Sequence, residues 1–110
     1  MPLSKRARIE VYLPARAKAA DRRLQRAFEQ EFLATFGGCT VINDIKGLYL
    51  GSDGNPDFDK INLVYADTPF DFDKNLAALS KYTDELKDAA KDASGEESIL
   101  IVVHEIYQSV

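Results

Sequence analysis

The chain has 110 residues, of which 45% are hydrophobic and 29% are charged, a composition typical of one globular domain spanning residues 1–110. Its 14 basic and 18 acidic side chains give a net charge of −4, which argues against a nucleic-acid partner. The longest apolar run has five residues and is too short to cross a bilayer. Since no apolar stretch of a secretory signal follows the basic N-terminal residues, we expect a cytoplasmic protein without a membrane partner.

The first predicted strand covers residues 9–13, whose side chains alternate between the two faces of a sheet. One face is apolar and is formed by Ile9, Val11 and Leu13. Glu10 and Tyr12 share the other face. Pro14 ends the strand because proline has no backbone N–H to donate.

Residues 24–36 carry apolar side chains at spacings of three and four, which predicts an amphipathic helix packed on the sheet. Asp21 is placed to act as the N-cap of this helix, since a carboxylate there accepts the unpaired backbone N–H groups. The pair Gly37–Gly38 ends the helix because glycine readily adopts a left-handed conformation. These glycines do not open a helix, so they predict no phosphate-binding loop. Cys39 is interpreted as a small buried hydrophobe.

A hairpin follows, with predicted strands at residues 39–45 and 60–66 around a turn at residues 51–57 that is rich in turn-forming residues. Gly47 either marks a bulge through which the first of these strands continues or lies where the turn begins. In the second strand, Val64 is expected on the open side of the sheet, across from Tyr12. The acidic residues of the turn do not have the spacing of a calcium-binding EF-hand loop, and no metal site is predicted.

A second apolar stripe over residues 72–90 predicts another helix, with Thr68 or Asp71 as its cap and Gly95 at its end. The last strand, residues 98–107, is hydrophobic on both faces.

Two strand–helix–strand halves joined by a hairpin predict an α+β fold, the ferredoxin-like βαββαβ sandwich, with antiparallel strand order 4-1-3-2. Both helices then cover one face of the sheet and leave the other open. The last strand lies at an edge, where a strand that is apolar on both sides is prone to aggregation. We therefore expect a homodimer in which the open sheet face and the strand at residues 98–107 pack against a second copy, as in dimeric α+β barrels.

Charge is unevenly distributed, because residues 1–30 carry a net charge of +5 and residues 31–110 a net charge of −9. One interpretation is a basic patch for an anionic partner. The other, which we favour, is that arginines of the first helix pair with acidic residues of the second. The residues concerned are Arg22, Arg23 and Arg26, and Asp84, Glu85, Asp88 and Asp92.

Antiparallel pairing of the first and last strands should bring His104 beside Arg8 and Glu10 on the open face. A histidine next to a carboxylate could act as a general base, and the phenol of Tyr12 could orient a substrate. The alternative is an ion-paired rim at a dimer interface. The candidate ligand pocket is formed by Glu10, Tyr12, Tyr49, Val64 and His104.

Three segments resemble a group of small bacterial proteins without an established activity. The group shares a strand ending in Leu-Pro, a helix ending in Phe-Gly-Gly and a Gly-Leu-aromatic element. This chain has them at Leu13–Pro14, Phe36–Gly38 and Gly47–Tyr49, although the aromatic residue of the group is often tryptophan. The resemblance covers residues 9–66, implies a soluble bacterial protein of ferredoxin-like fold, and transfers no catalytic residue.

Two functions are compatible with this sequence. The first is a homodimeric module that binds a small molecule or has a structural role. The second is a cofactor-independent enzyme resembling the small monooxygenases of the dimeric α+β barrel type, with an apolar pocket lined by Tyr12, Val64, Val102 and His104. No cofactor is predicted in either case. A cavity on which Tyr12 and His104 converge would favour the enzyme.

Overall fold

The computed structural model describes residues 2–94 and 99–109. Four strands and two helices follow one another in the predicted order: β1 (Leu3–Pro14), α1 (Ala19–Phe36), β2 (Thr40–Leu50), β3 (Pro56–Asp67), α2 (Leu76–Ser94) and β4 (Leu100–Ser109). Gly95 and residue 98, predicted to end the second helix and to begin the last strand, lie outside the described residues. Among the helices of the described part, none is both long and apolar enough to cross a membrane.

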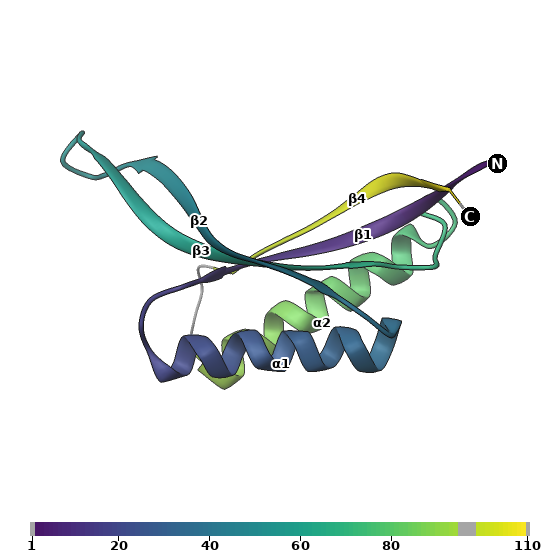
Figure 1. Ribbon diagram of the computed structural model, residues 1–110, viewed down its shortest axis with the longest axis horizontal. Helices are drawn as coiled ribbons and strands as arrows, with labels where there is room; N and C mark the ends of the chain where they lie inside the picture. Colours follow the sequence, from purple (N-terminus) through teal and green to yellow (C-terminus); the bar gives the residue numbers. More distant parts are fainter. Residues whose placement is uncertain (1, 95–98, 110) are drawn as a thin grey trace.

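The strands form one antiparallel sheet in the order β2-β3-β1-β4, which confirms the predicted topology. Both helices lie against the same face of this sheet, and the opposite face is uncovered, as Figure 1 shows. The two central strands, β1 and β3, pair over residues 8–14 and 61–67. The tip of the β2–β3 hairpin lies at the opposite end of the molecule from the two termini.

The core lies between the sheet and the helices because each element presents an apolar stripe to it. From β1 it takes Ile9, Val11 and Leu13, all at most 1% exposed. From α1 it takes Phe28 and Phe32, whose rings meet edge to face with centroids 6.3 Å apart. These five side chains are the ones that the strand and helix periodicities assign to the buried face.

The faces of β3 differ from the prediction for this strand. Val64 is fully buried in the helix-covered core, directly opposite Val11, and does not lie on the open face. Leu63 and Tyr65 instead lie on the open face, opposite Tyr12 and Glu10. Directly opposite residues of an antiparallel pair share a face, so the register with β1 decided which face of β3 the helices cover. The expectation that Val64 lies on the open side of the sheet was therefore wrong.

The connection from β1 to α1 is held by a buried carboxylate. The helix begins at Ala19, two residues before Asp21, so Asp21 is not its N-cap. Both oxygens of Asp21 accept hydrogen bonds from Arg16, one of them from the backbone N–H at 2.9 Å as well as from the guanidinium. At the other end the helix terminates as predicted, because Gly37 has φ +82° and donates its N–H to the carbonyl of Leu33.

The hairpin strands are longer than predicted, and the bulge lies at a different place. β2 continues through Gly47 to Leu50 and pairs with β3 as far as Pro56. The register shifts between Ile42 and Ile45, so that Asn43 and Asp44 of β2 lie opposite the single residue Asn62 of β3. Asp44 has φ +61°, a left-handed conformation that aspartate tolerates better than most residues.

Candidate functional site

Three of the predicted site residues come together on the open sheet face. The hydroxyl of Tyr12 donates a hydrogen bond to Oε1 of Glu10 at 3.1 Å. The other carboxylate oxygen of Glu10, Oε2, lies 3.3 Å from Nε2 of His104 on β4. This nitrogen is buried and has no aligned hydrogen bond within the described residues, so the pair is a charge contact when the imidazole is protonated. Burial, followed by the bond to Glu10, raises the pKa of Tyr12.

A second polar group extends this set along β1. Arg8 lies directly opposite His104 in the β1–β4 register and opposite Asp67 in the β1–β3 register. Its guanidinium makes two hydrogen bonds to the Asp67 carboxylate and stacks over the ring of Tyr65, 4.4 Å from the centroid. The guanidinium of Arg8 is therefore engaged by the Asp67 carboxylate and by the Tyr65 ring, and it is not free to bind an anion.

The other two members of the predicted pocket lie elsewhere. Tyr49 is on the β2–β3 hairpin opposite Asp57, is 51% exposed, and has its pKa raised by Asp59. Val64 lies in the core on the far side of the sheet. The antiparallel register with Val11 places Val64 there, and the alternation of β3 alone did not show it because both of its faces are apolar.

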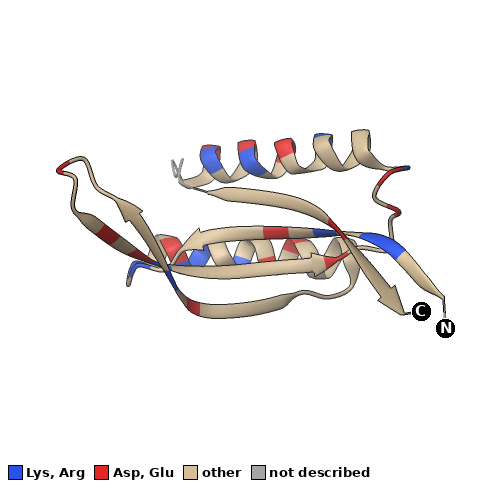
Figure 2. Ribbon diagram, turned by 90° about the horizontal axis from the view of Figure 1, so that it is seen from above, with Lys and Arg blue, Asp and Glu red and all other residues tan. Residues whose placement is uncertain are grey.

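Beside these polar residues, the open face carries exposed apolar side chains. Leu100 is 54% exposed on β4 and Ile42 is 44% exposed on β2. Half-buried Val102 and Ile106 follow Leu100 along the same face of β4. In Figure 2, charged positions of both signs occur along the strands as well as along the helices. An apolar sheet face of this kind is typical of a surface that packs against protein.

A cavity of about 330 Å³ lies at the end of the open face and is lined by Tyr12, Leu100 and Ile61 among other residues. His104 does not line it. The convergence of Tyr12 and His104 on one cavity, which would favour the enzyme hypothesis, is therefore not seen at this cavity in a single chain.

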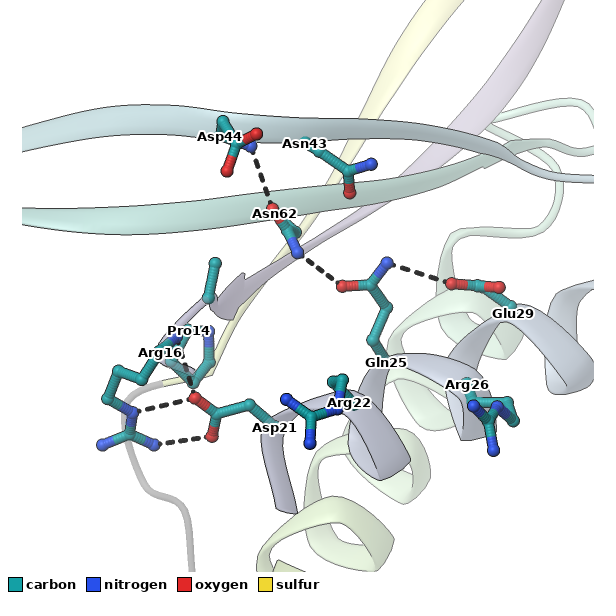
Figure 3. Close-up of a pocket in the computed structure, with 11 residues that line it drawn as sticks. Pro14, Arg16, Asp21, Arg22, Gln25, Arg26, Glu29, Asn43, Asp44 and Asn62 are labelled. Atoms are coloured by element: carbon teal, nitrogen blue, oxygen red, sulfur yellow. Dashed lines mark hydrogen bonds and ion pairs between the residues drawn. The ribbon is translucent and has the colours of Figure 1, made fainter. Parts of the chain in front are cut away.

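The sequence reasoning missed a larger groove on the helix-covered side of the sheet. It has a volume of about 470 Å³ and lies between the first turns of α1 and the strands β2 and β3. Figure 3 shows Asn43, Asp44 and Asn62 on its strand side, and Arg22 and Arg26 on its helix side. The unusual pair Asn43–Asp44 inside a strand was the available signal, because polar residues at a bulge often mark a site.

Cys39 is half-buried against the core, and burial raises the pKa of its thiol, with a smaller contribution from Glu29. The thiol is therefore mostly protonated and unreactive at neutral pH. Within residues 2–94 and 99–109, no three His, Cys, Asp or Glu side chains are grouped closely enough to hold a metal ion.

Comparison with solved structures bears on the fold. CutA1 from Oryza sativa superposes on 98% of this chain and 85% of its own with a TM-score of 0.59 at 17% identity. CPII, a nitrogen regulatory PII-like protein from Thiomonas intermedia K12 bound to ADP, AMP and bicarbonate, superposes on 99% of this chain and all of its own with a TM-score of 0.54 at 17% identity. The chain has the ferredoxin-like fold.

A phage SAM lyase in complex with S-methyl-5′-thioadenosine also superposes, on 94% of this chain and 85% of its own, with a TM-score of 0.59 at 9% identity. No family model and no curated protein matches the sequence. At these identities the likeness concerns the fold alone.

Proposed function

We propose that this chain is a self-associating module that binds a small molecule at its open sheet face. The observation that carries the proposal is the set Glu10, Tyr12 and His104, held in contact on an uncovered surface that also carries exposed apolar side chains. A second copy placed over Leu100 and Ile42 would remove their apolar surface from water. It would also enclose the polar set, which gives a concave apolar site with few polar groups.

Adenosine compounds are the first ligands to test. Three solved structures with this fold contain ADP with AMP or S-methyl-5′-thioadenosine. A tyrosine ring offers a stacking surface for a purine, and the Glu10 carboxylate offers an acceptor for an amino group. These features support an adenosine ligand for the module.

Self-association is tested by sedimentation velocity on a matched pair of variants. Leu100 and Leu33 are both 54% exposed, but Leu100 lies on the open face and Leu33 on α1. We expect Leu100→Lys to shift the protein to a monomer and Leu33→Lys to leave the oligomer intact. A wild-type protein that sediments as a monomer at high concentration would overturn the proposed assembly.

Ligand binding is tested by calorimetric titration with AMP and with S-methyl-5′-thioadenosine. Binding to the wild type should weaken at least about tenfold in Tyr12→Phe or His104→Gln, since each removes a polar contact of the proposed site. Tyr107→Phe, which changes a 60% exposed tyrosine of the same strand as His104, is the control. Equal affinity in all four proteins would place the site elsewhere, and absence of binding would remove adenosine compounds as ligands.

A second candidate is a cofactor-independent monooxygenase-like enzyme, favoured by the 3.3 Å contact between His104 and Glu10. In that role the imidazole would remove a proton from an electron-rich phenolic substrate. Oxygen uptake with a hydroquinone substrate, abolished by His104→Ala, is the expected result. Uptake that the His104→Ala variant retains would exclude the enzyme.

A further inference from the structure

We infer that the groove between α1 and the bulge of β2 is a separate binding site for a small phosphorylated polyol, such as a sugar phosphate. It lies on the helix-covered side of the sheet, so it does not depend on the open face or on self-association. Its volume of about 470 Å³ falls in the usual range for small-molecule sites.

The helix side of the groove carries two arginines that are available to an anion. Arg22 and Arg26 are four residues apart on α1, so their side chains lie on the same face of the helix. The predicted pairing with α2 is not formed, because neither side chain has an ion pair or a hydrogen-bond partner in the described part of the chain. Guanidinium groups bind phosphate through two parallel hydrogen bonds, which makes this pair suitable for a phosphate group.

Two of the three carboxylates that line the groove already have hydrogen-bond partners. The Asp21 carboxylate accepts hydrogen bonds from the Arg16 guanidinium, and Glu29 accepts a hydrogen bond from Gln25 at 3.0 Å. Of the acidic residues that line the groove, Asp44 alone has a carboxylate without a partner among the described residues. The three arginines and three carboxylates that line the groove balance in charge, and Arg22 and Arg26 are the cations left with donors for a phosphate group.

The strand side of the groove suits hydroxyl groups. Asn43 and Asp44 form the bulge opposite Asn62, and both line the groove. The Asp44 backbone stays in a left-handed conformation, with φ +61°, and its N–H donates to Oδ1 of Asn62 at 3.0 Å. The Asp44 carboxylate, which has no partner among the described residues, can accept hydrogen bonds from a diol. The Asn43 amide can both donate and accept. Strained backbone of this kind is more common at binding sites.

A chain of hydrogen bonds holds the two sides of the groove at a fixed separation. Asn62 on β3 accepts from the backbone of Asp44 and donates from Nδ2 to Oε1 of Gln25 at 2.7 Å. Gln25 in turn donates to Glu29 on the next turn of α1 (Figure 3). The bulge is thus tied to the helix that carries the arginines, which preorganises the site before a ligand arrives.

The test is calorimetric titration of the full chain with ribose 5-phosphate, with ribose and with inorganic phosphate as separate probes. We expect ribose 5-phosphate to bind at least about tenfold more tightly than either fragment, because it alone engages both sides. Binding of inorganic phosphate as tight as that of ribose 5-phosphate would overturn the polyol part of the inference. Absence of ribose 5-phosphate binding would overturn the whole.

Variants of α1 separate a site from general attraction to positive charge. Arg22→Gln and Arg26→Gln should each weaken ribose 5-phosphate binding at least about tenfold. Arg23→Gln, on the same helix but not lining the groove, should change it less than about twofold. Asp44→Asn keeps a residue that tolerates the left-handed conformation and should weaken ribose 5-phosphate but not inorganic phosphate. Equal losses in all three arginine variants would overturn the inference.

Circular dichroism of each variant verifies that it is folded. Where a variant does not fold, amide chemical-shift changes in the wild type take its place as the measurement. Ribose 5-phosphate should shift the amide signals of Asp44 and Arg26 before those of His104. Shifts confined to the open face would contradict the site.

Discussion

Val64 on β3 lies directly opposite Val11 on β1, and both side chains are completely buried beneath the helices. This pairing determines which alternate side chains of β3 point into the core and which point to the open side. The predicted pocket of five residues is consequently divided between the two sides of the sheet, and Glu10, Tyr12 and His104 remain together on the open side.

Substitution of Val64 measures this assignment. Val64→Ala should lower the free energy of unfolding by about 2 kcal/mol, because it removes two buried methyl groups and leaves a cavity. Val41→Ala makes the same change directly across on β2, where the side chain is 37% exposed, and should lower it by less than half as much. Urea unfolding of both variants provides the comparison, and equal losses would contradict burial of Val64.

Replacement of Glu10 should change the ionisation of Tyr12. The pKa of Tyr12 is raised by burial and then by its hydrogen bond to Glu10. Glu10→Gln removes the charge, and we expect the Tyr12 pKa to fall toward its ordinary value while burial keeps it somewhat raised. Ultraviolet titration of the phenols, with Tyr12→Phe to assign the transition, measures the change; an unaltered Tyr12 transition would show that the contact is not formed in solution.

Acid should weaken the connection between β1 and α1. The hydrogen bonds from Arg16 hold the pKa of Asp21 below its ordinary value. A lowered folded-state pKa means that the ionised carboxylate stabilises the fold above its unfolded pKa of about 4, and that this stability is lost as pH falls through the folded-state pKa.

Asp21→Asn should therefore lower the free energy of unfolding by about 2 kcal/mol at neutral pH, because it weakens a buried, charge-assisted contact. The difference between wild type and variant should shrink below about pH 4. Urea unfolding across this pH range measures it. A difference that persists at low pH would mean that the carboxylate charge is not the cause.

High pH should weaken the hydrogen bond that joins the two helices. The Tyr82 hydroxyl on α2 donates to Oε1 of Glu31 on α1 at 3.0 Å, and burial raises the pKa of Tyr82 to about 12. A raised pKa means that the neutral phenol stabilises the fold below its unfolded pKa of about 10, and that this stability is lost as pH rises toward 12.

Tyr82→Phe should remove the last phenol transition in an ultraviolet titration. It should also lower the free energy of unfolding by about 1 kcal/mol at neutral pH, because Glu31 loses a donor. Thr35, which also donates to Oε1 of Glu31, keeps this carboxylate partly satisfied, so a loss much greater than that would indicate another role for the hydroxyl.

The element order, the strand order and the uncovered face could be predicted from the sequence, since they depend on local periodicity and on the handedness of crossovers. The end of α1 at Gly37 was predictable for the same reason, because a left-handed residue is a local requirement. The contact of Glu10 with His104 followed from the antiparallel pairing of the first and last strands. The homodimer stays a prediction.

The faces of β3 and the groove beside α1 were decided by the tertiary structure. Both faces of β3 are apolar, so its alternation did not distinguish the covered side, and the register with β1 did. The groove depends on a bulge at Asn43 and Asp44 and on the hydrogen bond from Asn62 to Gln25 of α1, which are 37 residues apart in the chain. Such contacts between distant segments arise only when the sheet and the helix pack together, so neither periodicity nor composition could reveal them.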